Sequence, residues 1–155
     1  MDDTPREDEL VIRYSIAAPR DRVFAAWTEP TMLREWWGPG DFTCPEADVD
    51  LRPGGDYRLV MKAPQGPESI VTGTYEAVEP PARLVYTWRW AGGPPADPES
   101  LVTVEFADVE GDTEVTVRHS RLPQGEERSQ YDFGWRSGLE KMERLLVIGR
   151  AQPDS

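Results

Sequence analysis

The stretch EERSQYDFGWRSGLEKMERLLVI, residues 126–148, decides how the rest of the chain can fold. Counted from Trp135, apolar or small residues recur at offsets +3, +4, +7, +10 and +11. This is the spacing of one face of an α-helix. The residues are Gly138, Leu139, Met142, Leu145 and Leu146. The stretch therefore predicts a long helix whose apolar face needs a sheet to cover it.

The opposite face and the ends of this helix are also indicated. The polar side chains expected in water are Arg136, Glu140, Lys141, Glu143 and Arg144. Ser129 and Asp132 have the spacing of a capping box, which predicts that the regular helix begins near Ser129. Gly149 suits the left-handed position after the last turn, and Pro153 prevents a restart.

Composition limits the kinds of protein this can be. The 155 residues suggest one domain spanning residues 9–149, between an acidic tail at 1–8 and a second tail at 150–155. A net charge of −12 argues against nucleic acid and anionic membrane as partners. The sequence has no long apolar run and no secretory signal. A single cysteine, Cys44, fits a reducing compartment, so we expect a cytoplasmic protein.

Alternating apolar residues before the long helix predict a sheet. A strand is expected over residues 10–16, followed by a short helix that begins at Pro19 and stops at Pro30, and by a second short helix over 31–36. Turn signals then separate six expected strands, at residues 42–51, 57–61, 71–75, 84–90, 102–106 and 115–119. This order predicts an α+β fold in which a curved antiparallel sheet wraps around the C-terminal helix.

These elements carry residues that match a known family. They are Val23, Phe24, Trp27, Thr28, Leu33, Trp36, Trp37, Pro39, Asp50, Arg52, Gly54, Gly55, Met61, Gly73, Tyr75, Pro80, Pro81, Arg83–Val85, Thr87, Trp88, Val102–Val104, Phe106, Gly134 and Trp135. With them the chain resembles bacterial single-domain relatives of the C-terminal domain of the activator of Hsp90 ATPase. Those proteins belong to the START-like (SRPBCC) superfamily of helix-grip folds.

The resemblance implies an elongated cavity between the sheet and the long helix. Superfamily members include lipid carriers, polyketide aromatases and cyclases, hormone receptors and antibiotic-resistance proteins. One resistance branch binds enediyne antibiotics and is destroyed in neutralising them. Because one fold hosts many tasks, the resemblance alone does not select among these.

Strand parity indicates which side chains face the long helix. The candidate ligand-binding residues are Trp36, Trp37, Met61, Tyr75, Tyr86, Trp88, Trp90, Phe106, His119, Trp135, Leu139 and Met142. One interpretation is an ordinary core, with His119 hydrogen-bonded to a neighbouring tyrosine. The other is a ligand pocket, because Tyr and Trp carry polar tips that a core built only for packing would avoid.

Smaller motifs have structural interpretations as well. The segment Trp36-Trp37-Gly38-Pro39 is either a lid that holds the short helices or a ligand contact. Arg52, Gly54 and Gly55 indicate a tight turn rather than an anion site, and Cys44 is expected to be inert.

Catalytic and metal motifs are absent from the sequence. A single histidine and a single cysteine cannot supply the usual zinc ligands, and no nucleotide or nucleophile-elbow motif occurs, so no metal and no cofactor are expected. What remains for an enzyme is His119 as a general base beside a tyrosine hydroxyl, or an inward carboxylate with a raised pKa.

The sequence therefore favours a protein that encloses a hydrophobic, aromatic or polyketide-type molecule. Its sharpest version is self-sacrifice against a toxic natural product, with Gly92, Gly93 and Gly111 as candidate cleavage sites. An aromatase- or cyclase-like enzyme using His119 is the alternative. An Hsp90 co-chaperone domain is a further alternative, disfavoured because the chain lacks the additional N-terminal domain of the full activators.

Overall fold

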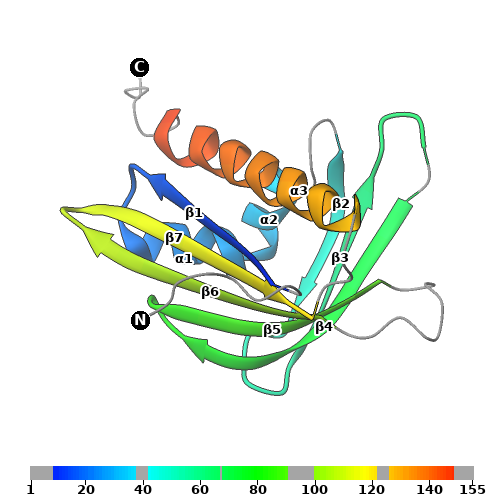
Figure 1. Ribbon diagram of the computed structural model, residues 1–155, viewed down its shortest axis with the longest axis horizontal. Helices are drawn as coiled ribbons and strands as arrows, with labels where there is room; N and C mark the ends of the chain where they lie inside the picture. The colour runs from blue at the N-terminus through cyan, green and yellow to red at the C-terminus, as the bar shows by residue number, and fades with distance from the viewer. Residues whose placement is uncertain (1–8, 38–41, 67, 91–99, 122–125, 149–155) are drawn as a thin grey trace.

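The computed structural model describes residues 9–37, 42–66, 68–90, 100–121 and 126–148 (Figure 1). In chain order the elements are β1 (Leu10–Ile16), α1 (Arg20–Thr28), α2 (Pro30–Trp36), β2 (Thr43–Val49), β3 (Asp56–Lys62), β4 (Glu68–Glu79), β5 (Arg83–Trp90), β6 (Ser100–Val109), β7 (Asp112–Ser120) and α3 (Glu126–Glu143). A π-helical turn, η1 (Arg144–Ile148), continues α3. The predicted tails fall outside the described residues.

The strands form one antiparallel sheet of seven, in the order β1-β7-β6-β5-β4-β3-β2. The sheet curls so that α3 lies across its concave side, while α1 and α2 lie beside α3 on the same side (Figure 1). Among the described residues, none of the helices combines the length and the hydrophobicity that a transmembrane span requires. The predicted α+β helix-grip fold is confirmed.

Alternation in the sequence places one face of each strand in the core. In β7 the buried positions are Thr113, Val115, Val117 and His119, while the residues between them are partly exposed. His119 pairs with Val102 on one side and with Leu10 on the other, so β6, β7 and β1 present one continuous apolar row. The expected inward parity of these strands is therefore confirmed.

The long helix covers this concave face, although it differs from the prediction in detail. Its buried residues include Trp135, Leu139, Met142 and Leu146, as expected, while Leu145 is only partly buried. The capping box is wrong, because α3 already includes Glu126 and Ser129 therefore lies inside the helix. Gly149 and Pro153 lie outside the described residues.

Two polar residues of α3 are used to attach the helix rather than to face water. The Lys141 Nζ donates to the carbonyl of Phe42 at 2.9 Å, and the Tyr14 hydroxyl donates to Glu143 Oε1 at 2.7 Å. Both contacts tie α3 to parts of the chain far away in sequence. Burial and the neighbouring Glu143 raise the pKa of Tyr14 to about 12, so its hydroxyl keeps its proton.

Other helices and strands begin or end a few residues away from the predicted positions. Pro30 ends α1 as expected, but it also begins α2, because a proline fits the first turn of a helix without loss of a hydrogen bond. The strand predicted over 42–51 is shorter, Thr43–Val49, and contains an irregularity between Thr43 and Glu46.

Gly73 is the position where the sheet tolerates no side chain. The Tyr57 ring from β3 crosses over Gly73 of β4, and its hydroxyl donates to the carbonyl of Thr87 on β5 at 2.5 Å. The Thr74 N–H donates to Thr87 Oγ1 at 2.8 Å. A Cβ at Gly73 would overlap the Thr87 carbonyl oxygen and the Tyr57 ring.

We expect Gly73→Ala to destabilise the protein by about 3 kcal/mol, near the upper end for overpacked sites, because neither backbone nor buried ring can yield. Ser69→Ala on the same strand, a partly buried site, should change the free energy of unfolding by less than about 0.5 kcal/mol. Urea unfolding of both variants provides the comparison. Equal free energies of unfolding for the two variants would show that the contacts around Gly73 do not exclude a side chain at this position.

Candidate functional site

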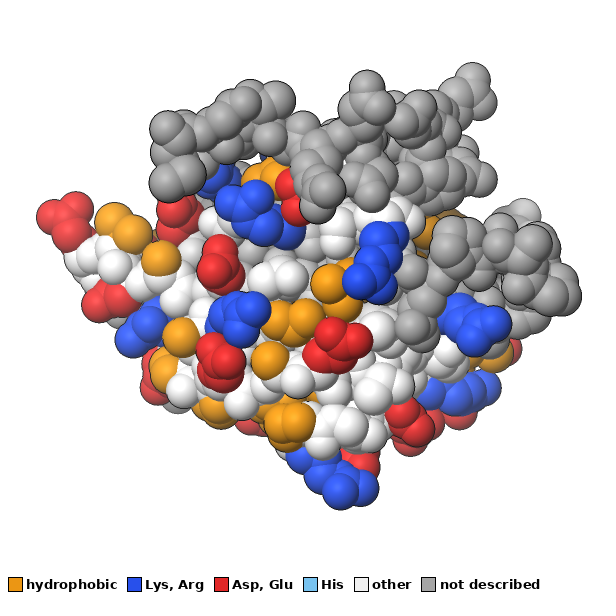
Figure 2. Space-filling model, turned by 60° about the horizontal axis from the view of Figure 1, so that its bottom comes forward, with side chains coloured by type: hydrophobic (Ala, Val, Ile, Leu, Met, Phe, Trp, Pro, Cys, Tyr) orange, Lys and Arg blue, Asp and Glu red, His pale blue; other side chains and the backbone are white. Residues whose placement is uncertain are grey.

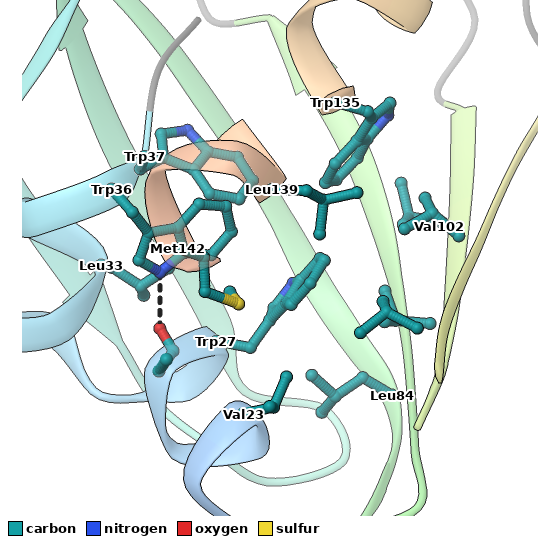
Figure 3. Packing of buried hydrophobic residues seen from close by; sticks show 14 of the residues in the cluster. Val23, Trp27, Leu33, Trp36, Trp37, Leu84, Val102, Trp135, Leu139 and Met142 are labelled. Atoms are coloured by element: carbon teal, nitrogen blue, oxygen red, sulfur yellow. Dashed lines mark hydrogen bonds between the residues drawn. The ribbon is translucent and has the colours of Figure 1, made fainter. Parts of the chain in front are cut away.

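The candidate residues come together between α3 and the concave face of the sheet. Those from the strands are Met61, Tyr75, Tyr86, Trp88, Phe106 and His119, all buried. Those from the helices and the end of α2 are Trp36, its C-cap neighbour Trp37, Trp135, Leu139 and Met142, also buried (Figure 3). The Trp90 side chain lies outside the description. The rings touch one another, and a ligand cavity among them stays a prediction.

Indole rings form the centre of this cluster. The ring centroids of Trp37, Trp88 and Trp135 lie 5.6–5.8 Å from one another. Trp27 of α1 stacks on Trp135 at 5.9 Å and contacts Trp36 at 5.1 Å (Figure 3). Such pairs are each worth about 0.5–1.5 kcal/mol beyond their buried area, so the aromatic contacts contribute to holding the helices on the sheet.

Three tyrosines extend the cluster under β3, β4 and β5. The centroids of Tyr57, Tyr75 and Tyr86 lie 5.3–5.9 Å apart. The Trp27 Nε1 donates to the Tyr86 hydroxyl at 3.1 Å and links this group to the indoles. Burial raises the pKa of Tyr75 and Tyr86, so both phenols remain neutral and can act as hydrogen-bond donors.

His119 is fully buried, and both of its ring nitrogens are engaged. The Trp135 Nε1 lies 3.1 Å from Nδ1, and the Ser100 Oγ lies 2.8 Å from Nε2. An indole nitrogen can only donate, so Nδ1 of His119 must accept. Because burial lowers the pKa of His119 to about 3, the neutral ring carries its proton on Nε2 and donates it to Ser100.

The chain of hydrogen bonds ends on the backbone. Ser100 Oγ donates to the carbonyl of Trp88 at 3.3 Å, so the direction runs from Trp135 through His119 and Ser100 to β5. His119 therefore has no lone pair left for a general base in this arrangement. The expected tyrosine partner is wrong: Tyr131 instead packs its ring against the imidazole at 4.8 Å, nearly perpendicular.

The remaining candidates lie apart from this cluster. The Gly54 N–H donates to the Tyr75 carbonyl at 2.7 Å, and the Gly55 N–H donates to the Arg52 carbonyl at 2.8 Å. These amides are occupied, as expected of a turn rather than an anion site. Burial raises the pKa of Cys44 to about 11, so the thiol stays protonated.

Among the candidate cleavage sites, only Gly111 is described. It lies in the β6–β7 turn with φ +92°, and His119 follows it by eight residues along β7. At about 3.3 Å per residue the two are roughly 26 Å apart, which places Gly111 far from the imidazole end of the cluster. Gly92 and Gly93 lie outside the described residues, as do Gly38 and Pro39.

The convex side of the sheet carries a polar groove of about 630 Å³. Its lining includes Arg58, Arg89, Thr72, Asp48 and Asp56, so it mixes both signs of charge. In Figure 2, which brings the bottom of Figure 1 forward, acidic and basic side chains likewise alternate rather than gather by sign. In the described ranges no group of three His, Cys, Asp or Glu side chains could hold a metal ion.

Sequence reasoning missed four members of the cluster: Trp27, Tyr57, Ser100 and Tyr131. Ser100 has the same strand parity as Val102 and Val104, so extending that alternation by one step would have placed it inward. Tyr57 likewise alternates with Leu59 and Met61. Tyr131 lies four residues before Trp135, on the same helix face.

Comparison with known proteins agrees with this architecture. The family described as Activator of Hsp90 ATPase homolog 1-like protein matches residues 17–147. A search of curated proteins found no match.

Solved structures are similar over nearly the whole chain. A protein from Nitrosomonas europaea is 26% identical with a TM-score of 0.80, covering 96% of this chain and 100% of its own. A Silicibacter pomeroyi protein is 26% identical with a TM-score of 0.79, over 91% and 99%. DynU16, from the dynemicin biosynthetic locus, is 25% identical with a TM-score of 0.75; the match covers 93% of this chain but 49% of DynU16.

The buried imidazole should make stability depend on pH. The pKa of His119 falls from 6.5 in the unfolded chain to about 3 in the fold, so between these values the unfolded state binds more protons. The contribution of the neutral imidazole to the free energy of unfolding is thus fully present above about pH 6.5 and is lost as the pH falls toward 3. In His119→Gln the amide can accept from Trp135 and donate to Ser100, but it cannot titrate.

Between about pH 7 and about pH 5, we expect the wild type to lose about 1–2 kcal/mol more than His119→Gln. Urea unfolding of both proteins at the two pH values measures this difference. Parallel losses in the two proteins would mean that His119 is not buried in its neutral form.

Proposed function

The chain belongs to the family of Activator of Hsp90 ATPase homolog 1-like proteins, and we propose that it binds a hydrophobic aromatic or polyketide-type small molecule between α3 and the sheet. The family match and the helix-grip fold support a ligand-binding domain. The nature of the ligand comes from the side chains that surround this interior.

The observation that carries the proposal is the composition of the core. Five indoles and three phenols meet where Leu, Ile and Val would pack without polar tips: Trp27, Trp36, Trp37, Trp88, Trp135, Tyr57, Tyr75 and Tyr86. Aromatic walls with a few placed polar groups are typical of small-molecule sites. A flat ligand would replace ring–ring contacts with ring–ligand stacking, so the rings must separate to admit it.

A narrower version is protection against a toxic natural product. DynU16 supports it, because that similar protein comes from the dynemicin biosynthetic locus. In the self-sacrifice form, a bound diradical would abstract hydrogen from a glycine Cα, since the resulting radical is delocalised over both adjacent peptide groups. The distance of Gly111 from His119 argues against that turn, which leaves Gly92 and Gly93 as the candidates.

The two alternatives have less support. A cyclase that used His119 as its base would first have to break the hydrogen bond from Trp135 or reverse the one to Ser100. Stimulation of Hsp90, which the family name suggests, would need a surface complementary in charge to that partner. The net charge of −12 disfavours association with an acidic protein.

We expect polycyclic aromatic molecules to bind with micromolar affinity or better and to quench tryptophan fluorescence saturably. In NMR titrations the indole N–H of Trp135 should shift, while the amide of Phe133, 62% exposed on α3, should not. Fluorescence and NMR together separate interior from surface binding. Unsaturable quenching, or shifts confined to Phe133, would count against an interior site.

The self-sacrifice version predicts focused cleavage. After incubation in air with a reductively activated enediyne, dioxygen can add to the glycyl radical and the oxygenated residue then breaks the backbone, so mass spectrometry should detect two fragments that meet at Gly92 or Gly93. A double variant, Gly92→Ala with Gly93→Ala, should survive longer because the C–H bond at alanine is less easily broken. Intact wild-type protein, or cuts scattered along the chain, would leave only reversible binding.

A further inference from the structure

Trp37 differs from Trp27, Trp36 and Trp135 of the same cluster in its hydrogen bonding. Trp27 donates to the Tyr86 hydroxyl, Trp36 to the Ala26 carbonyl and Trp135 to His119 (Figure 3 shows the Trp36 bond). Trp37 is equally buried, with 5% of its surface exposed. Yet its Nε1 has no acceptor among the residues that the structure describes.

A buried donor without an acceptor destabilises the state that contains it, because the donor has lost its hydrogen bond to water. Buried polar groups are therefore almost always paired, and each exception needs an explanation. A phenylalanine would fill much of the same space without this penalty. The presence of tryptophan at position 37 thus points to an acceptor supplied from elsewhere.

The side chains around Trp37 indicate what kind of molecule would carry that acceptor. Trp36 and Trp135 meet its ring edge-on, at 5.2 and 5.8 Å with interplanar angles of 65° and 89°. Trp88 lies at 5.7 Å, tilted by 38°. Three indole rings pack against the Trp37 ring, so a group that reaches its Nε1 from within the cluster must itself be largely flat and apolar.

We propose that Trp37 is the specificity-determining donor of the site, and that the ligand is a fused aromatic ring system bearing a ketone or quinone oxygen that accepts from Trp37 Nε1. This inference rests on the proposed interior binding function and deepens it. The ring system stacks against Trp88 and Trp135, while the oxygen satisfies the donor. A polycyclic hydrocarbon of the same shape gains the stacking but leaves the donor unpaired.

Anthraquinone and anthracene form a matched pair of probes, since both are flat tricycles and differ in two carbonyl oxygens. The measured quantity is the ratio of their dissociation constants in wild type, Trp37→Phe and Trp36→Phe. Each variant loses one indole, but only the first loses the unpaired donor. Taking the ratio cancels the loss of ring area and the difference in hydrophobicity between the probes.

We expect Trp37→Phe to shift the ratio toward anthracene by about tenfold, and Trp36→Phe to leave it within about twofold. In wild type, anthraquinone but not anthracene should move the ¹⁵N–¹H indole signal of Trp37 downfield. A ratio unchanged in Trp37→Phe would overturn this inference while leaving interior binding intact. If neither probe binds saturably, the proposed function fails and the inference with it.

Discussion

A curled sheet can bury its concave face only if something fills the space beneath the covering helix, and here aromatic rings do so. Leu139 and Met142 of α3 and Leu146 of η1 contribute the aliphatic contacts, while the indoles fill the remaining space between the helices and the strands. Rings with polar edges then require partners inside an apolar interior. The hydrogen bonds of Trp27 and Trp135 meet that requirement and attach α1 and α3 to the sheet, while that of Trp36 attaches α2 to α1.

The hydrogen bond between Trp135 and His119 has the widest consequences. Because an indole only donates, it fixes the imidazole tautomer, and the tautomer in turn fixes the direction of the Ser100 hydroxyl. A histidine close to a serine in a buried site has the composition of a nucleophile and its base. The direction of the hydrogen bonds here is opposite to the one such chemistry needs, so composition and distance alone would mislead.

The sequence was sufficient for the fold because its main signals are periodic. Alternation along β6 and β7 and the spacing after Trp135 each follow from one buried face. The errors occurred where a local pattern competed with a tertiary contact. Ser129 and Asp132 have capping-box spacing inside a helix that had already begun, and Lys141 and Glu143 have polar character but attach α3 to the rest of the chain.

The site could be predicted only as a list of inward residues. Parity placed His119 and Trp88 on the same face, yet it could not say which atoms would meet. The partner of His119 was wrong because Ser100 lies just before the strand expected over residues 102–106, whereas β6 begins at Ser100. The distance of Gly111 from the imidazole follows from the eight residues between them along β7, so the expected strand already contained the argument against that turn.

The crossing at Gly73 restricts which residues can occupy neighbouring positions on three strands. The Tyr57 ring occupies the space that a side chain at position 73 would need, and its hydroxyl ends on the Thr87 backbone. A smaller residue at 57 would not make room for a side chain at 73, because the Thr87 carbonyl oxygen would still overlap its Cβ. Among relatives that keep this approach of β4 to β5, position 73 should therefore remain glycine. An unvarying glycine at this position would mark, in a family alignment, the point where the Tyr57 side chain of β3 crosses β4 to reach the backbone of β5.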